Sequence, residues 1–326
     1  MRMVSIIMPV HNTGSILTDS IGSIINQKYE DWELIIVDDG SNDMETISLL
    51  AYYCQFDRRI RCIRSDVSVG AANSRNKGVD FASGEFLICL DSDDFFYSDM
   101  LSEMVGAIRG TDSELCICDF VSFDDKTGKI WESSHLVHIP GITDRTFNLN
   151  ELGERGLLYW WMSPWEMLCR RSFIEKNKIR FQDIPCCNDI FFGVMCAQRA
   201  KKIIYAKGGK PLMKYRTGRN NSISSNRHPA YVFEAVKEVA AQISDKTSME
   251  FRQLMVFLCE CSMMLFFAYG NDDDKEYYDF LREFFSTNMN AWNIKEDDSK
   301  RRMMYFIDND YESKWYKKLA DGGEFW

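Results

Sequence analysis

The sequence predicts an α/β fold in which a mostly parallel sheet is flanked by helices and followed by a helical C-terminal region. Three observations support this prediction. Short apolar runs bounded by polar residues or glycine recur through the first hundred residues, as buried parallel strands require. Segments of helical length separate these runs, which gives the β-α-β order of such sheets. Long segments with helical spacing of apolar residues fill the chain beyond residue 226.

The predicted strands of the first hundred residues end at polar or turn-forming residues. They span residues 4–8, 34–37, 60–64 and 86–90. Pro9 ends the first, Asp38 the second and Asp91 the fourth. The connecting segments 16–25, 44–56 and 71–82 are predicted to be helices.

The second half of the chain is more mixed. We predict a helix over 100–108 and a strand over 115–123, followed by a turn at 124–128 that leads to 129–131. A connector rich in Arg, Asn and Ser, residues 217–228, precedes the helical region. The helices expected there span 230–243, 249–268 and 276–286.

Charge and hydropathy exclude two classes of protein. The chain has 326 residues, with 39 Lys and Arg against 49 Asp and Glu, and so a formal net charge of −10. A general nucleic-acid binder would instead show a basic surface. The most apolar stretch, residues 254–267, contains Glu260 and is shorter than the roughly 20 residues that span a bilayer, so we expect a buried helix there.

The cysteines indicate a reducing compartment. There are eleven, none in a C-x-x-C pair, and the four histidines are scattered, so a structural zinc site is poorly supported. We assign no role to His135 or His138. An odd cysteine count without a signal-peptide pattern predicts free thiols in the cytoplasm.

Polar residues follow three of the predicted strands, where ligands of open α/β sheets bind. The three segments are Pro9-Val10-His11-Asn12, Asp38-Asp39-Gly40-Ser41 and Asp91-Ser92-Asp93-Asp94. The last crowds three carboxylates into four residues, which is unfavourable unless a cation compensates. Mg²⁺ or Mn²⁺ carrying a diphosphate would do so. The alternative is an acidic loop that caps the following helix.

Two further segments are informative only in combination. Asp39 fits an ordinary turn, or a carboxylate that accepts a hydrogen bond from the N–H of uracil, thymine or guanine. Residues 70–78 begin a helix with Gly70 and two alanines, which allow a ligand to approach closely. Arg75 in that helix can bind phosphate, although a helix with a surface arginine is commonplace.

Taken together, four ordered segments within residues 3–105 resemble the family-2 glycosyltransferases, which have the GT-A fold. The segments span residues 5–12, 35–41, 70–78 and 82–94. The resemblance implies that Asp39 reads the base, usually uracil, that Asp93 is the direct ligand of Mn²⁺ or Mg²⁺, and that Asp91 binds the metal or lies nearer the ribose. It also implies a donor site that includes Pro9, Val10, His11, Asn12, Gly70, Arg75 and Ser92.

The resemblance is looser in the second half. Residues 181–192 resemble the element that bears the catalytic base, which implies that role for Asp189. Many relatives have Glu where this chain has Asn188. Asp183 is a weaker candidate for the base, and Asp189 could instead be an ordinary helix N-terminal acid. The segments 215–216 and 222–224 resemble a loop that closes over the donor, so Arg216 or Arg219 could contact the diphosphate or simply be exposed.

Three tryptophans could contact the acceptor. Aromatic rings stack on the apolar faces of sugars, and Trp160, Trp161 and Trp165 lie in the half expected to bind it. Trp161 and Trp165 are also one helical turn apart, so we expect at least one of the three to be core.

The resemblance implies an inverting transfer of a sugar from a nucleoside-diphosphate donor, expected to be a UDP-sugar, to an acceptor hydroxyl. Residues 1–225 would form the catalytic domain, with a nucleotide-binding half (1–100) and an acceptor-binding half (101–225), and 226–326 a helical region. The expected setting is polysaccharide or glycolipid assembly in the cytoplasm or at the inner face of the membrane. Peripheral membrane contact and self-association stay open.

Three other classes of protein share parts of this pattern. A non-catalytic relative that binds sugars would not need the intact acidic motifs. A receiver module phosphorylated on Asp38 or Asp91 would be far shorter than this chain. A phosphatase would carry its D-x-D motif at the first strand, where this chain has Met8-Pro9-Val10-His11.

Overall fold

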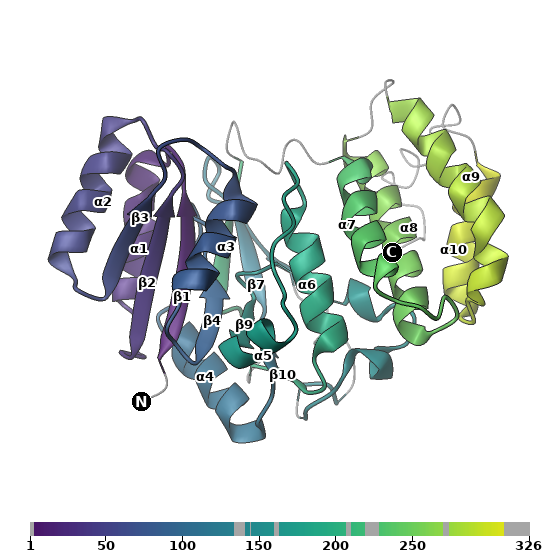
Figure 1. The fold of residues 1–326 in the computed structure, drawn as a ribbon, viewed down its shortest axis with the longest axis horizontal. Helices are drawn as coiled ribbons and strands as arrows, with labels where there is room; N and C mark the ends of the chain where they lie inside the picture. The colour runs from purple at the N-terminus through teal and green to yellow at the C-terminus, as the bar shows by residue number, and fades with distance from the viewer. Residues whose placement is uncertain are drawn as a thin grey trace.

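The computed structural model describes residues 3–133, 141–143, 145–159, 163–206, 210–218, 228–269 and 274–309. Two sheets and the helices around them form one elongated molecule, with the larger sheet towards the N-terminal end and four helices at the other (Figure 1). The predicted α/β class with a helical C-terminal region is confirmed.

The larger sheet contains seven strands in the order β10-β6-β9-β4-β1-β2-β3. Its neighbours pair in parallel except β9, which is antiparallel to both β4 and β6. The strands are β1 (Val4–Val10), β2 (Trp32–Asp38), β3 (Ile60–Arg64), β4 (Phe86–Cys89), β6 (Leu115–Ile117), β9 (Met167–Arg170) and β10 (Ile203–Tyr205). The four strands predicted in the first hundred residues are all present and adjacent.

The predicted helices between these strands are also present. They are α1 (Leu17–Ile25), α2 (Met44–Phe56), α3 (Ala71–Phe81) and α4 (Met100–Thr111), and the later helices α5 (Arg171–Lys176) and α6 (Asn188–Arg199) follow β9. Helix α3 packs directly on β1 because Gly78 has no side chain. A Cβ at Gly78 would lie 2.3 Å from Cγ2 of Ile7, closer than real contacts allow.

The prediction that Pro9 ends the first strand was wrong, since β1 continues to Val10. In β1 the carbonyl of Val10 accepts from Asp39 towards β2, and that of Ile7 accepts from Leu90 towards β4. Pro9 therefore faces the β4 side, where pairing already ends at Ile7. Its missing N–H leaves no ladder bond unmade, so the strand tolerates it.

The predicted strand 115–123 is in fact two strands in different sheets. Strand β6 ends at Ile117 in the larger sheet, and β7 (Phe120–Asp124) begins in a second sheet of order β5-β11-β7-β8. The chain changes sheets at Cys118 and Asp119, and an unbroken apolar run cannot reveal this. The other members are β5 (Phe95–Phe96), β8 (Ile130–Ser133) and β11 (Met213–Thr217). The predicted turn at 124–128 joins β7 to β8.

Within residues 228–269 and 274–309, the structure has four helices: α7 (Pro229–Ala241), α8 (Met249–Tyr269), α9 (Lys275–Trp292) and α10 (Asp297–Asp308). The first three were predicted, and α10 was missed. Helix α10 buries Ser299, Arg302, Met303 and Phe306, which have helical spacing. Two of these four side chains are polar or charged, so the apolar periodicity that signals a buried face is absent.

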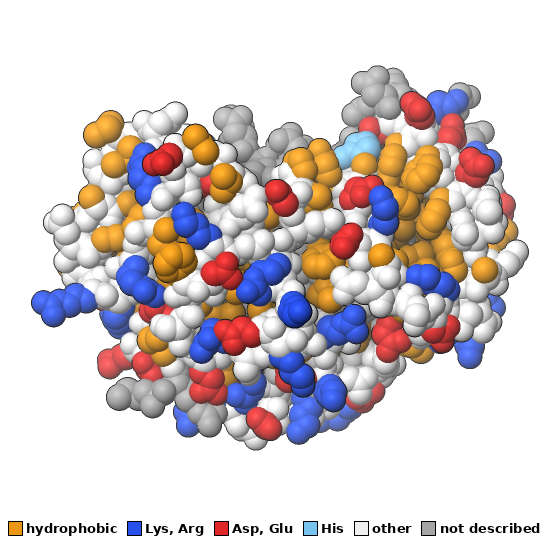
Figure 2. Space-filling model, in the orientation of Figure 1, with side chains coloured by type: hydrophobic (Ala, Val, Ile, Leu, Met, Phe, Trp, Pro, Cys, Tyr) orange, Lys and Arg blue, Asp and Glu red, His pale blue; other side chains and the backbone are white. Residues whose placement is uncertain are grey.

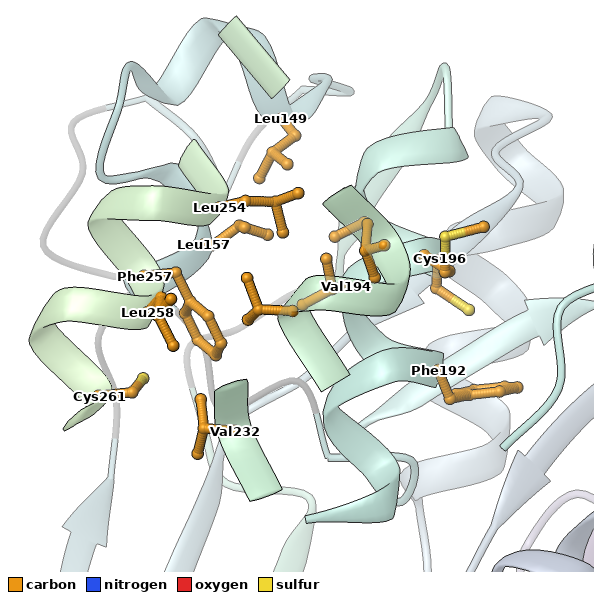
Figure 3. Packing of buried hydrophobic residues seen from close by; sticks show 14 of the residues in the cluster. Leu149, Leu157, Phe192, Val194, Cys196, Val232, Leu254, Phe257, Leu258 and Cys261 are labelled. Atoms are coloured by element: carbon orange, nitrogen blue, oxygen red, sulfur yellow. The ribbon is translucent and has the colours of Figure 1, made fainter. Parts of the chain in front are cut away.

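The C-terminal helices share a hydrophobic core with the part of the chain that forms the larger sheet. Val194 of α6, Val232 of α7 and Leu254 of α8 belong to one cluster of buried side chains, which also includes Leu149 and Leu157 from the segment before β9 (Figure 3). At about 25 cal/mol per Å² of buried apolar surface, such a shared cluster strongly favours the docked arrangement. The division of the chain near residue 225 stays a prediction, because residues 219–227 lie outside the described residues.

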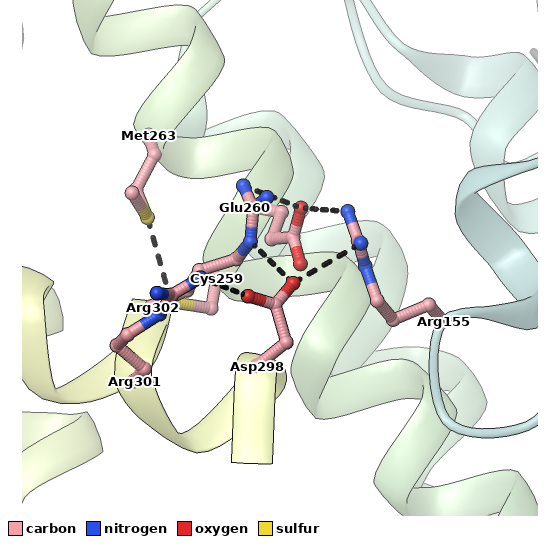
Figure 4. Close-up of polar contacts among 7 residues, drawn as sticks. All are labelled: Arg155, Cys259, Glu260, Met263, Asp298, Arg301 and Arg302. Carbon is pink, nitrogen blue, oxygen red and sulfur yellow. Dashed lines mark hydrogen bonds and ion pairs between the residues drawn. The ribbon is translucent and has the colours of Figure 1, made fainter. Parts of the chain in front are cut away.

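A network of charged side chains also connects these helices to the segment before β9. Arg155 contacts Glu260 of α8 and Asp298 of α10, each at 3.2 Å (Figure 4). Arg302 of α10 contacts the same two acids at 3.7 and 3.0 Å. Burial raises the pKa of Glu260 although both arginines oppose the shift. Removing either arginine would leave Glu260 a buried acid with less compensation.

One face of the molecule carries charges of both signs in a mixed pattern, and hydrophobic side chains gather over α7, α8 and α9 (Figure 2). Phe233 of α7 contacts the rings of Phe280 and Phe284 of α9 there, with centroids 5.3 and 5.4 Å apart. Among the described helices, none is both long and apolar enough to cross a membrane.

Candidate active site

The three polar segments that follow β1, β2 and β4 meet at one edge of the larger sheet, as predicted. The backbone N–H of Asn12 donates to Oγ of Ser41 at 3.0 Å, which joins the first segment to the second. The hydroxyls of Thr13 and Ser92 lie 2.8 Å apart, which joins the first segment to the third. Parallel strands bring their carboxyl ends together, and this convergence defines the candidate site.

His11 and Asp39 lie together at this edge. His11 is exposed, and its Nδ1 lies 2.7 Å from the carbonyl oxygen of Asp39. The carboxylate of Asp39 accepts from Oγ of Ser68 at 2.6 Å and from the backbone N–H groups of Val69 and Gly70 at 2.8 and 2.9 Å. Burial opposes its ionisation, but these hydrogen bonds outweigh burial and lower the pKa of Asp39.

Asp39 therefore shapes the loop that precedes α3. Gly70, at the start of that helix, has φ +89°, a conformation that L side chains rarely adopt. A base that bound Asp39 would add its hydrogen bond to a carboxylate that already accepts three. The base-reading role of Asp39 stays a prediction.

Arg75 links the acidic loop after β4 to helix α6, which carries the predicted general base. Its side chain is buried, with a residue exposure of 6%. Nη2 donates to Asp91 at 2.6 Å, and Nη1 donates to Oδ1 of Asn188 at 2.8 Å. Burial disfavours the charge, yet attraction to Asp91 prevails and raises the pKa of Arg75. The guanidinium thus donates to two protein acceptors, and its predicted contact with the nucleotide or its phosphates stays a prediction.

Asp189 lies in the first turn of α6, next to Asn188, and is half-buried. Cys187 precedes this helix in a left-handed conformation with φ 58°, and its carbonyl accepts from the N–H of Ile190. Asp183, the weaker candidate, is exposed in the loop before the helix. The sequence did not reveal Asn188 as the acceptor for Arg75, because the two residues are 113 positions apart.

The three acids of the Asp91-Ser92-Asp93-Asp94 loop have different environments. The side chain of Asp91 is 28% exposed and pairs with Arg75, and Asp93 is half-buried. Asp94 is buried, and its Oδ1 accepts from the backbone N–H of Arg216 at 2.7 Å. Burial, and then the charges of Asp93 and Asp91, raise the pKa of Asp94 well above 3.8. Asp94 is thus an internal anchor of the loop.

Arg216 holds this loop from β11. Its Nε donates to the carbonyl of Asp93 at 2.8 Å, and its Nη atoms pair with Asp19, at 2.8 Å, and with Asp125. The side chain is 5% exposed, so these partners enclose the guanidinium. The predicted contact of Arg216 with the diphosphate stays a prediction. Arg219, the other candidate, and the segment 222–224 lie outside the described residues.

The acidic loop fits a divalent cation by its chemistry. Asp91 and Asp93 supply carboxylate oxygens, which Mg²⁺ and Mn²⁺ prefer, and both are partly exposed. After burial, the charges of Asp93 and Asp91 raise the pKa of Asp94, so the acids of this loop repel one another. Within the described part of the chain, no three His, Cys, Asp or Glu side chains are grouped to hold a metal alone. A cation here would therefore take further oxygens from a diphosphate.

Of the three predicted acceptor tryptophans, Trp165 lies among the described residues. Trp165 is 4% exposed, stacks on Tyr215 with centroids 5.7 Å apart and meets Phe120 edge-on at 4.6 Å. Trp165 is therefore the core tryptophan expected among the three, and its ring has no face for a sugar. Trp160, Trp161, His135 and His138 lie outside the described residues.

Comparison with protein families gives a match to the model described as Glycosyl transferase family 2 over residues 5–189. Glycosyltransferase GlyG of Streptococcus pneumoniae serotype 4 is 30% identical over 130 residues, or 40% of this chain and 43% of its own length. The putative glycosyltransferase EpsH of Bacillus subtilis is 30% identical over 219 residues, or 65% of this chain and 60% of its own length. The match thus spans less than two thirds of each relative.

A third relative and one solved structure have more informative names. The UDP-Glc:alpha-D-GlcNAc-diphosphoundecaprenol beta-1,3-glucosyltransferase WfgD of Escherichia coli is 37% identical over 103 residues, or 32% of this chain and 40% of its own length. Residues 1–349 of S. aureus TarS, solved with UDP-GlcNAc, superpose with a TM-score of 0.73 at 16% identity and cover 97% of this chain and 92% of that one. At that identity the likeness shows the fold.

Proposed function

Because the chain belongs to the family-2 glycosyltransferases and has their GT-A fold, we propose that it transfers a sugar from a UDP-sugar to an acceptor hydroxyl with inversion at the anomeric carbon. One observation carries the proposal: Arg75 contacts both Asp91, at the donor edge, and Asn188, which adjoins Asp189. The donor motif and the acid predicted to be the base therefore belong to one site.

Asp189 is the proposed general base. The acceptor hydroxyl must lose its proton as the new glycosidic bond forms, and a carboxylate within reach can accept it. Asp189 suits this role because it is half-buried at the start of α6, so it is neither sealed in the core nor fully surrounded by water. In a single displacement of this kind, no covalent link between sugar and enzyme is needed.

Asp93 and Asp91 are the proposed ligands of Mg²⁺ or Mn²⁺. Such an ion supplies stabilisation of the negative charge that grows on the departing diphosphate. Arg75 orients Asp91 by a 2.6 Å contact, and Arg216 holds the carbonyl of Asp93, so the protein fixes both ends of the loop. Asp39 is proposed to accept the N–H of the uracil base beside His11.

For the acceptor we propose a glycan or glycolipid of cell-surface polysaccharide assembly. The name of the relative WfgD specifies a diphosphoundecaprenol-linked acceptor, and TuaG of Bacillus subtilis, 37% identical over 103 residues, is named for teichuronic acid biosynthesis. We place the protein in the cytoplasm, at the inner membrane face where such acceptors would be reached, with residues 101–225 as the acceptor-binding half.

A thermal-shift screen of UDP-sugars with and without Mn²⁺ tests the donor, since a ligand stabilises only the state that binds it. Release of UDP in the presence of the stabilising donor then tests transfer or hydrolysis. A non-catalytic relative would be stabilised by a donor and release no UDP. A protein that no UDP-sugar stabilises, with or without Mn²⁺, would contradict the proposed donor class.

A further inference from the structure

Two adjacent cysteines precede the helix that carries Asp189. Cys186 is buried and Cys187 is half-buried, and their sulfur atoms lie 3.8 Å apart. Both are reduced in the structure. The proposed transfer reaction assigns neither thiol a role.

We propose that Cys186 and Cys187 are a dithiol site for small disulfides of the glutathione type, and that closing the bond between them displaces the first turn of α6. The effect on activity rests on the proposed role of Asp189, which lies in that turn. The closure itself does not depend on that role.

Cys187 is the sulfur that a reagent meets first. It is the more exposed of the two, and it lies in a loop without regular structure in which Asp183 and Pro185 are exposed. Cys187 is also the residue immediately before α6, so a bond to its sulfur acts directly on the start of that helix. Cys186 lies behind it, within contact distance, as the resolving thiol.

The chemistry balances with one small disulfide as oxidant. The sulfur of Cys187 attacks one sulfur of that disulfide, whose S–S bond breaks, and one small thiol leaves. The sulfur of Cys186 then attacks the mixed disulfide at Cys187, and the second small thiol leaves. Two electrons pass from the cysteines to the reagent, and the two cysteine protons end on the two released thiols.

The closed form is strained and therefore easily reduced. The sulfurs must approach from 3.8 Å to the bond length of about 2.05 Å. Neighbouring Cα atoms are about 3.8 Å apart across a trans peptide, less than the roughly 4.4 Å at which ordinary disulfides begin. Strained disulfides have more oxidising potentials, so reduction by excess thiol is expected to reopen the bond.

The strain falls on the start of α6. Cys187 already has φ 58°, and its carbonyl accepts the helical N–H of Ile190 at 3.1 Å. The next residue, Asn188, holds Arg75 through its side chain. The later part of the helix is anchored in the core by Phe192 and Val194, so displacement is confined to the first turn. Oxidation would thus move Asp189 relative to Arg75 and Asp91.

A second pair of neighbouring thiols could also react with a small disulfide and must be removed from the test. Cys54 of α2 and Cys62 of β3 share a thiol–thiol hydrogen bond, which lowers the pKa of Cys54 to about 7. This pair lies at the far edge of the larger sheet from α6 (Figure 1). Changing both residues to Ser removes its oxidation from the measurement.

The test uses the full chain carrying Cys54→Ser and Cys62→Ser, treated with oxidised glutathione. We expect a mass loss of two hydrogen atoms in the peptide with Cys186 and Cys187, and faster hydrogen exchange at residues 188–191. UDP release should fall by up to about 10²-fold, because a misplacement of about 1 Å can cost that much, and recover with dithiothreitol. A Cys187→Ser variant should keep its activity under oxidation, whereas Cys186→Ser should stop at the mixed disulfide on Cys187 and show no loss of two hydrogen atoms.

The readouts separate this proposal from the proposed function. A stable mixed disulfide without closure, or closure with unchanged exchange at 188–191, would overturn the dithiol proposal. A reduced protein that releases no UDP from any donor would overturn the proposed function alone, because mass and exchange are measured without turnover. Oxidised protein that closes the bond yet keeps full activity would overturn the link between the dithiol and Asp189.

Discussion

The guanidinium of Arg75 donates a 2.8 Å hydrogen bond to the side-chain oxygen of Asn188, and this contact joins α3 to the first turn of α6. The same guanidinium pairs with Asp91 at 2.6 Å. One buried cation therefore sets the distance between the acidic loop and the helix that carries Asp189. Because Asn188 is neutral, this charge is stabilised mainly by Asp91, and Asp189 contributes less.

Arg75→Lys should lower kcat/KM although it keeps the positive charge. Lysine keeps the cation but lacks the planar fork that reaches two acceptors. We expect kcat/KM to fall by about 10²-fold, and the free energy of unfolding to fall by about 1–3 kcal/mol, since a buried acceptor loses its donor. Steady-state kinetics and urea denaturation measure the two effects.

Arg180→Lys is the matched control for that variant. Arg180 pairs with Asp80 at 3.0 Å on the surface, with side-chain exposures of 39% and 60%. Exposed pairs contribute about 0–1 kcal/mol, so both quantities should stay close to those of the parent. An Arg75→Lys enzyme as active as this control would show that Arg75 does not position the site.

Arg216→Ala should raise the Mn²⁺ concentration needed for half-maximal activity by about 10–100-fold, the usual cost of removing a group that orients a metal ligand. The reason is its hydrogen bond to the carbonyl of Asp93. Arg216→Lys should restore part of the affinity, a rescue that a purely structural role would not predict for Mn²⁺. Asp19→Asn, which removes an exposed partner of Arg216, serves as the control. An unchanged Mn²⁺ requirement in Arg216→Ala would contradict the account.

The sequence predicts which residues lie at the edge of the sheet that forms the site. It does not predict the contacts that hold those residues in place. Strand ends and turn residues are local features, so Asp39, Asp91 and Asp93 could be placed at one edge from periodicity and the four motifs. The partners of Arg75 and Arg216 come from distant segments, and no local pattern encodes which carboxylate meets which buried guanidinium. Tertiary packing also decides where β6 ends and β7 begins, and that α10 buries a partly polar face. Periodicity therefore misses both features.

Glu33→Gln should destabilise the fold mainly at neutral pH. The carboxylate of Glu33 accepts from Ser5 at 2.6 Å and from Ser83, and pairs with Arg61. Burial opposes its ionisation, but the hydrogen bonds outweigh burial and lower its pKa from 4.5. Its stabilisation is therefore complete above pH 4.5 and is lost as the pH falls through the lowered pKa.

We expect Glu33→Gln to cost about 2 kcal/mol at pH 7, and the difference from the parent to shrink below pH 4.5. Urea denaturation across this pH range measures both. Glu234→Gln, which alters an exposed pair with Lys237, should have little effect at any pH. A difference that grows on acidification would have the wrong sign for this linkage.

Asp93→Asn should abolish the part of donor binding that depends on Mn²⁺. An amide is a weaker ligand for a hard cation than a carboxylate, and it removes one negative charge. In a thermal-shift titration, we expect the stabilising UDP-sugar to lose its Mn²⁺-dependent increment. Asp66→Asn, an exposed acid on the loop after β3, should keep it. Equal increments in the two variants would rule out Asp93 as a metal ligand.

The proposed role of Asp189, removal of the proton of the acceptor hydroxyl, is tested directly by one pair of variants. Asp189→Asn should lower kcat by about 10²–10⁴-fold, the usual contribution of a general base, and leave Mn²⁺-dependent donor stabilisation unchanged. Asp183→Asn, at the exposed acid of the preceding loop, should keep the parental rate. If Asp189→Asn turned over at the rate of the parent while Asp183→Asn failed, Asp189 would not be the base.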